Sequence, residues 1–218
     1  MFPGHLAVAL GAKRFEPRLP LGAAVAAAFG LDLLWPILVL SGAEVVSVQP
    51  GLMAFSNLSF DSYPWSHSLL AALVWSGLAA LLARVANQSW RVSAILGCLV
   101  ASHWVLDFVT HRPDLPLWPG GPLVGLGLWE SIPGTFLIEG GMLFVGVRFY
   151  VRATPVHDRV GLWGLIAPVG LVALIWITGP WSPPPPSGKA VASAALILWL
   201  FPFWAWWIDA HRAPSDLA

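Results

Sequence analysis

Six long runs of apolar residues restrict this chain to a helical fold in a membrane. A helix needs about 20 apolar residues to cross the hydrocarbon core of a bilayer, and runs of that length occur at 19–41, 65–84, 91–111, 134–152, 160–179 and 190–210. Strands of a membrane barrel would be about 10 residues long and would alternate in polarity. These runs are longer and do not alternate. The sequence therefore predicts an all-α polytopic membrane protein with about six transmembrane helices and a short half-helix at the N-terminus.

Prolines mark the ends of these runs. Pro17 and Pro20 precede the first run, Pro64 precedes the second, and Pro183 to Pro186 separate the last two. Proline rarely continues a helix, so these positions delimit the spans. No internal repeat is visible. We expect a single transmembrane domain, 1–218, with the short N-terminal helix in 1–18 and an extracytoplasmic loop in 43–63.

The composition excludes a water-soluble domain. Hydrophobic residues make up 57% of the chain and charged residues 10%, whereas soluble domains carry about 25% charged residues. Basic and acidic residues are balanced at 11 each, so there is no positive surplus to follow a nucleic acid backbone. Cys98 is the single cysteine, which excludes an internal disulfide and a cage of thiolates around a metal. The expected partner is membrane lipid and not nucleic acid, and the oligomeric state is left open.

The basic residues predict the direction of the spans. Short cytoplasmic loops are enriched in lysine and arginine. In an arrangement of six spans, only Arg112 and Lys189 fall on one side. The other nine fall on the opposite side: Lys13, Arg14, Arg18, Arg84, Arg91, Arg148, Arg152, Arg159 and Arg212. Both termini are therefore predicted to be cytoplasmic.

Several ionisable residues interrupt the apolar runs at similar depths. Such groups cost some 2.5 to 3.5 kcal/mol on insertion scales, and by default they are paired or functional. Counting about 1.5 Å per residue from the nearest cytoplasmic arginine places them about 14 to 25 Å into the bilayer. They are Asp32, His67, His103, Asp107 and Glu139. This level, in the middle and outer half of the bilayer, is consistent with one shared site.

His103 and Asp107 form the most specific local pattern. Residues four apart lie on the same face of a helix, so both side chains can reach one ion. The alternative is a histidine hydrogen-bonded to the aspartate one turn away. Within a bilayer we favour ligation, because an ionisable pair in hydrocarbon is costly without a function.

The remaining candidates each have a structural alternative. Asp32 is a ligand or a neutral acid that bridges helices, and His67 is a ligand or an interfacial histidine bonded to Ser66. Glu139 lies beside two glycines that permit close helix approach, and no partner for it is evident in its own run. His5 joins the site only if the N-terminal segment rises into the bilayer as a helix.

His111 and Asp114 follow the third apolar run. Asp114 could simply be a solvated turn residue paired with Arg112. In the functional interpretation, His111, Asp114 or Glu139 acts as a general base or orients a metal ligand. We therefore consider these three residues as candidate catalytic groups.

The order of these motifs resembles that of a known family. An early His5 and an Asp32 late in the first span are followed by Ser-His-Ser-Leu-Leu at 66–70, Ser-His-x-x-x-Asp at 102–107 and Pro-Leu-Trp-Pro at 116–119. This pattern is similar to that of the bacterial inner-membrane proteins described as predicted membrane-bound metal-dependent hydrolases. The His-x-x-x-Asp element also resembles, more weakly, that of the all-helical zinc phospholipases C and related nucleases.

The resemblance implies a metal centre in a bacterial inner membrane. Its metal ligands would be His5, Asp32, His67, His103 and Asp107. Imidazole and carboxylate ligands without a thiolate favour zinc among the divalent metals. The leading hypothesis is a membrane-embedded metal-dependent hydrolase that acts on a lipid or lipid-linked phosphoester. The alternatives are a transporter for metal ions or protons, in which the same residues form a transit site, and a non-catalytic scaffold whose helices are joined by polar contacts.

Overall fold

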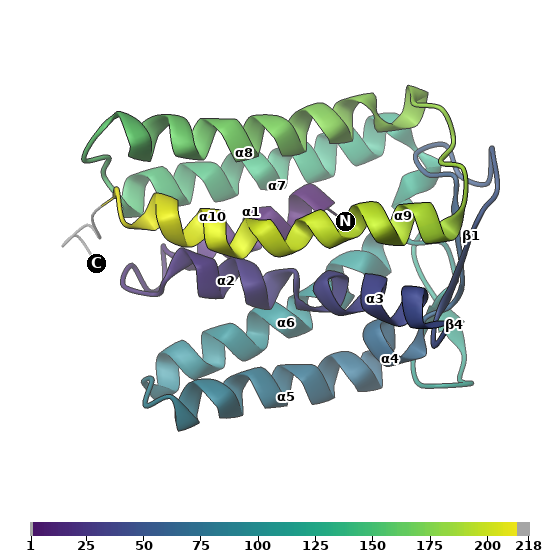
Figure 1. Ribbon diagram of the computed structural model, residues 1–218, viewed down its shortest axis with the longest axis horizontal. Helices are drawn as coiled ribbons and strands as arrows, with labels where there is room; N and C mark the ends of the chain where they lie inside the picture. The colour runs from purple at the N-terminus through teal and green to yellow at the C-terminus, as the bar shows by residue number, and fades with distance from the viewer. Residues whose placement is uncertain (1, 213–218) are drawn as a thin grey trace.

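Helices form nearly all of the regular structure in the computed structural model, which describes residues 2–212 (Figure 1). The α-helices are α1 (Phe2–Ala12), α2 (Leu21–Ala28), α3 (Gly30–Ser41), α4 (Pro64–His67), α5 (Leu69–Val85), α6 (Trp90–Thr110), α7 (Ile132–Ala153), α8 (Arg159–Thr178), α9 (Gly188–Ala195) and α10 (Leu200–Asp209). Short 3-10 helices are η1 (Leu128–Glu130), η2 (Gly179–Trp181) and η3 (Leu196–Trp199). The all-α prediction is confirmed.

Four or five segments of the described chain are long and apolar enough to cross a membrane. Four are continuous: Trp90–Thr110, Ile132–Ala153, Arg159–Trp181 and Gly188–Asp209. The fifth is the pair α2 and α3, which is bent by 52°. The predicted number of six is slightly larger than this.

The difference arises at the second predicted span, 65–84. Ser68 adopts an extended conformation (φ −71°, ψ 151°) and separates α4 from α5. The remaining helix α5 has 17 residues, or about 25 Å at 1.5 Å per residue, against a hydrocarbon core of about 30 Å. A break that the apolar pattern does not reveal therefore shortens this span.

The predicted N-terminal half-helix is present as α1, and it lies inside the bundle. It packs against α2, α6, α7 and α8, and its small residues allow the neighbouring backbones to approach closely. The closest approach is at Gly146 of α7, where a Cβ atom would lie 2.4 Å from the carbonyl oxygen of Ala7. Figure 1 shows α1 behind α10, with its first residues among the other helices.

Two small hairpins lie at one end of the bundle. Strands β1 (Val45–Val48) and β2 (Leu58–Ser62) pair antiparallel, and so do β3 (Leu115–Pro116) and β4 (Leu123–Val124). The segment 43–63, predicted as a loop, is therefore largely a hairpin. The pairing of Val45 with Ser62 brings the residue before β1 next to the start of α4.

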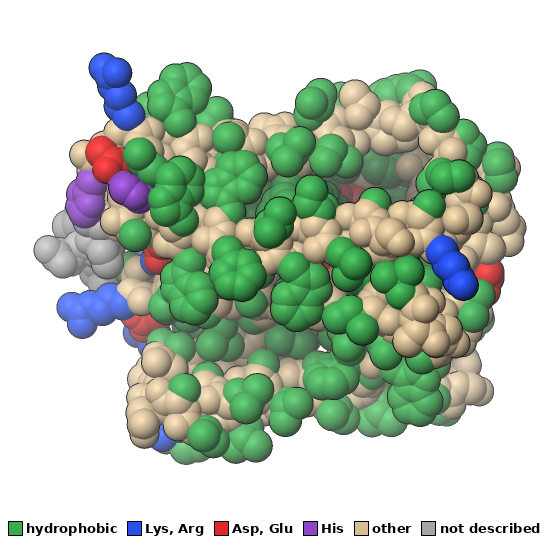
Figure 2. All heavy atoms as spheres, viewed as in Figure 1, with side chains coloured by type: hydrophobic (Ala, Val, Ile, Leu, Met, Phe, Trp, Pro, Cys, Tyr) green, Lys and Arg blue, Asp and Glu red, His purple; other side chains and the backbone are tan. Residues whose placement is uncertain are grey.

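A buried ion pair joins three helices at the opposite end. The Lys13 ammonium lies 2.9 Å from Asp209 Oδ1 and donates to the Leu19 carbonyl at 2.8 Å. The backbone N–H of Leu21 donates to Asp209 Oδ2 at 3.0 Å. These contacts connect the ends of α1, α2 and α10. In Figure 2 most of the charged side chains on the visible face lie at this end, and hydrophobic side chains cover the middle.

The close packing of α1 on α7 generates a prediction. Gly146→Ala places a methyl group against the backbone of Ala7, and overpacking of this kind typically costs about 1–3 kcal/mol. Gly141 lies on the same helix with nothing within 4 Å of its Cβ position, so Gly141→Ala is the matched control. We expect a lower melting temperature for Gly146→Ala and no loss for Gly141→Ala, measured by thermal unfolding in detergent. Equal melting temperatures would contradict the contact.

Candidate metal centre

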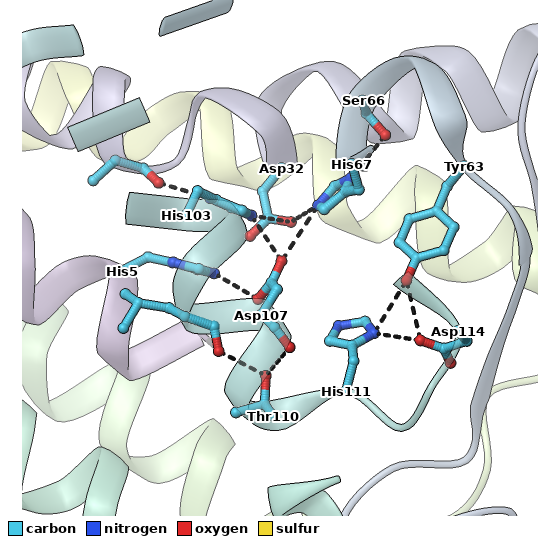
Figure 3. Close-up of polar contacts among 12 residues, drawn as sticks. His5, Asp32, Tyr63, Ser66, His67, His103, Asp107, Thr110, His111 and Asp114 are labelled. Carbon is cyan, nitrogen blue, oxygen red and sulfur yellow. Dashed lines mark hydrogen bonds and ion pairs between the residues drawn. The ribbon is translucent and has the colours of Figure 1, made fainter. Parts of the chain in front are cut away.

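Two histidines and two aspartates bring their ligand atoms together between α3, α4 and α6 (Figure 3). His67 Nε2 lies 3.5 Å from Asp32 Oδ1 and 3.7 Å from Asp107 Oδ2. His103 Nε2 lies 3.7 Å from Asp32 Oδ1 and 3.2 Å from Asp107 Oδ2. Tetrahedral ligands at zinc distances of about 2.0–2.1 Å would be about 3.3 Å apart. The four histidine–aspartate distances are close to this value. The described ligand atoms that lie within 4.8 Å of one another form two groups that share His103: His5, His103 and Asp107, and Asp32, His67 and His103.

The local structure explains how each ligand reaches the centre. His103 and Asp107 lie one turn apart on the same face of α6, as their spacing predicts. Asp32 lies in the first turn of α3, directly after the bend. His67 is the last residue of α4, before the break at Ser68. Two of the three elements that supply ligands therefore do so beside a helix break.

The bend between α2 and α3 also orients His103. Carbonyl groups in the last turn of a helix lack a partner within that helix. The carbonyl of Ala28, the last residue of α2, accepts a hydrogen bond from His103 Nδ1 at 2.7 Å. Because a carbonyl oxygen only accepts, Nδ1 carries a proton, and in the neutral imidazole the lone pair is then on Nε2. Among the described residues His103 Nε2 is buried without a hydrogen-bond partner, as a metal-ligating nitrogen requires.

His5 contacts the other side of the Asp107 carboxylate. Its Nε2 lies 3.2 Å from Asp107 Oδ1, and its ring stacks on that of His103 with centroids 3.7 Å apart and planes inclined by 8°. With His103 and Asp107, His5 forms one of the two groups of described residues whose ligand atoms could hold a metal ion. His5 therefore lies in the cluster, where the sequence predicted it only if the N-terminal segment is helical.

The centre is buried on every side but one. The side chains of His5 and His103 are fully buried, and those of His67 and Asp107 nearly so. The Asp32 side chain is 24% exposed. Structural zinc sites are closed, whereas catalytic sites keep one position open to water or substrate. The Asp32 side chain is therefore the most exposed part of the cluster.

His111 and Asp114 lie beyond the end of α6 in a separate cluster with Tyr63. Asp114 Oδ1 lies 3.0 Å from His111 Nδ1 and accepts from the Tyr63 hydroxyl at 3.1 Å, and Arg112 Nε donates to Asp114 Oδ2 at 3.3 Å. Burial and the Asp114 carboxylate raise the pKa of Tyr63 well above its usual range, so its hydroxyl remains a donor. Asp114 pairs with Arg112 as expected, but it is buried and not solvated.

Glu139 is buried on α7 and is only partly hydrogen-bonded. Trp129 donates to its Oε1 at 3.0 Å, whereas its Oε2 has no hydrogen-bond partner among the described residues. The Trp129 ring also lies 4.9 Å from the His111 ring, measured between centroids. The indole therefore connects Glu139 with the Tyr63 cluster. None of the three candidate catalytic residues lies in the groups of described residues whose ligand atoms are within 4.8 Å of one another.

Sequence reasoning missed two residues that contact this region. Glu44, in the predicted loop, is buried and accepts from the backbone N–H groups of Trp65 and Ser66. Tyr63 supplies the hydroxyl that contacts Asp114. A signal for Glu44 exists in the sequence, because Pro64 marks a helix start, where unpaired N–H groups need an acceptor. The sequence does not indicate which acid would supply it.

The fold and the cluster together define a helical protein with membrane-length segments and buried histidine and aspartate groups that could hold a metal ion. No protein-family profile, curated protein or solved structure matches the chain.

The geometry predicts the effect of removing a ligand. His103→Ala and Asp107→Ala each remove one ligand atom of the shortest of the four contacts in the centre, that between His103 Nε2 and Asp107 Oδ2. The amount of divalent metal retained should therefore fall at least about tenfold. His157 is exposed and lies outside these groups, so His157→Ala is the control. Metal content of the purified proteins, measured by mass spectrometry, tests this prediction. Wild-type protein without stoichiometric metal would contradict the centre.

Proposed function

We propose that the protein is a membrane-embedded metal-dependent hydrolase with a single divalent ion, zinc being favoured, held by Asp32, His67, His103 and Asp107. The observation that carries the proposal is the set of four contacts, at 3.2–3.7 Å, between two imidazole nitrogens and two carboxylate oxygens inside an apolar bundle. Nitrogen and oxygen ligands without thiolate suit zinc. When bound, the ion would polarise a phosphoryl or acyl oxygen and acidify a water molecule.

The chain itself supplies groups that can hold and move protons. Hydrolysis needs an acceptor for a proton of the attacking water and a donor to the leaving oxygen. Glu139 Oε2 is a buried acceptor that is free of hydrogen bonds among the described residues. The His111 and Asp114 pair, with Tyr63, is a second proton-holding group. We assign proton transfer to these groups and retention of the ion to the four ligands.

The position of the centre supports a proposal for the class of substrate. Asp107 lies three residues before the end of α6, so the centre is about 5 Å, at 1.5 Å per residue, from that end of the helix. Figure 2 shows a hollow between α8 and α9, with an acidic side chain at its floor. Both features suit a substrate with a polar ester group and an apolar tail that remains in the bilayer. We propose a lipid or lipid-linked phosphoester.

The basic residues support an orientation in which the end of the bundle nearest the metal centre faces outward. Nine of eleven basic residues would then be cytoplasmic, and the centre would lie in the outer half of the bilayer. The resemblance to bacterial inner-membrane proteins favours that membrane, with both termini cytoplasmic.

Thiol labelling tests this orientation. In a Cys98→Ser background, Lys189→Cys should react with an impermeant reagent added to intact cells, because Lys189 is exposed and predicted to be outside. Arg152→Cys, also exposed, should react only after permeabilisation. The opposite pattern would reverse the orientation.

An assay of lipid turnover tests the activity. Zinc-loaded protein in nanodiscs is supplied with phosphatidic acid, a phosphomonoester, or phosphatidylglycerol, a phosphodiester, and the released phosphate or head group is measured. We expect turnover of one substrate class that a chelator abolishes and zinc restores. His103→Ala should be inactive and His157→Ala active. Stoichiometric zinc without turnover of either lipid would contradict the hydrolase.

A transporter is the second candidate, and the helix breaks favour it. Asp32 follows the break between α2 and α3, and His67 precedes the break between α4 and α5. Transporters often bind ions at such discontinuous helices. Zinc flux into proteoliposomes, in the absence of lipid turnover, would support this function. Without bound metal in the wild type, the polar cluster would be a scaffold that joins helices.

A further inference from the structure

We propose that Glu44 is a positioning residue for His67: through the hydroxyl of Ser66 it holds the His67 proton on Nδ1 and so directs the Nε2 lone pair into the metal centre. The inference rests on the proposed metal centre and adds a group that lies outside it. Glu44 is 1% exposed and belongs to the segment that connects α3 to the first hairpin.

Three hydrogen bonds hold Glu44 at the start of α4. Its Oε1 accepts from the backbone N–H groups of Trp65 at 2.9 Å and Ser66 at 2.8 Å. Its Oε2 accepts from the Ser66 hydroxyl at 2.7 Å. The first N–H groups of a helix have no partner within it and favour negative charge. The carboxylate is therefore fixed in position by the helix that carries His67.

The direction of the chain of hydrogen bonds follows from the chemistry of its ends. A carboxylate only accepts, so the Ser66 hydroxyl proton points to Glu44. The Ser66 oxygen is then an acceptor towards His67 Nδ1, which lies 2.7 Å away. The proton of the neutral imidazole must therefore be on Nδ1. The lone pair is left on Nε2, the atom that faces Asp32 and Asp107.

His67 and His103 thus have the same tautomer, set by different acceptors. The Ala28 carbonyl accepts from His103 Nδ1, and the Ser66 oxygen, oriented by Glu44, accepts from His67 Nδ1. Outer hydrogen bonds of this type fix the tautomer of metal-ligating histidines, and their loss typically reduces metal affinity by about 10–100-fold. A hydroxyl can act in either direction, so the serine alone would not select the tautomer. Glu44 determines the tautomer, because it accepts the hydrogen bond of the Ser66 hydroxyl.

The substitution Glu44→Gln tests the direction of these hydrogen bonds, because it changes the side-chain volume very little. The amide oxygen can still accept from the two backbone N–H groups at the start of α4, but the amide nitrogen then donates to the Ser66 oxygen. The serine proton turns to His67 Nδ1, and the imidazole proton moves to Nε2. We expect zinc affinity to fall by about 10–100-fold, measured by chelator competition on the full chain in nanodiscs.

A second variant and a control separate this role from folding. Ser66→Ala removes the hydroxyl and leaves both backbone hydrogen bonds to Glu44, so it should weaken zinc binding without disturbing α4. Asp61→Asn alters an acid of β2, in the hairpin that follows Glu44. Asp61 accepts from Ser59, no contact with His67 is found among the described residues, and this variant should bind zinc like the wild type.

A tautomer measurement distinguishes failure of this inference from failure of the metal centre. ¹⁵N NMR of metal-free protein with labelled histidine reports which nitrogen of His67 carries the proton, and His67→Ala assigns the signal. We expect Nδ1 in the wild type and Nε2 in Glu44→Gln. The role of Glu44 would be overturned if His67 kept its Nδ1 proton in Glu44→Gln and, provided that the wild type binds zinc, the zinc affinity were unchanged. Absence of zinc binding in the wild type would refute the metal centre. The spectra would still show whether Glu44, through Ser66, holds the proton on His67 Nδ1.

Discussion

The Asp107 carboxylate is the contact on which the centre of the bundle depends. Its two oxygens lie within 3.2–3.7 Å of three imidazole rings, those of His5, His67 and His103, which come from three different helices. An isolated carboxylate in hydrocarbon is costly, so the surrounding helices must bring polar partners to it. This requirement is met where α1, α4 and α6 meet at one level.

The helix α6, which carries Asp107, is a continuous span, but the other helices around the cluster are not. The helix α1 has 11 residues and begins inside the bundle, α2 and α3 are bent by 52°, and α4 is separated from α5 by Ser68. A continuous helix satisfies its own backbone and offers only side chains to its neighbours, whereas a helix end also offers unpaired carbonyl or N–H groups. The Ala28 carbonyl orients His103, and the first N–H groups of α4 hold Glu44. Irregular backbone is thus used where it faces the polar cluster, the setting in which a membrane protein tolerates it.

The hairpin between α3 and α4 contributes more than a connection. By pairing Val45 with Ser62 it brings Glu44 to the start of α4, and Tyr63, at its end, contacts Asp114. One segment therefore contacts both the ligand group, where Glu44 and Ser66 meet His67, and the separate cluster of His111 and Asp114, which Tyr63 contacts. The apolar helices provide the frame, and the polar chemistry is concentrated where the chain leaves them.

The sequence by itself determined the helical class and most of the helix positions, because a run of about 20 apolar residues in lipid can satisfy its backbone hydrogen bonds within one segment only as a helix. It also placed His103 and Asp107 on one face, because the helical repeat is a local property. The tertiary structure decided the rest. Whether His5 joins the cluster depended on how α1 packs on α7, and the number of continuous spans depended on the backbone conformation at Ser68, which hydropathy does not encode. The separation of His111 and Asp114 from the ligand group, and the role of Glu44, depend on long-range contacts of a hairpin and a loop. Their partners are distant in sequence, so only the folded chain specifies them.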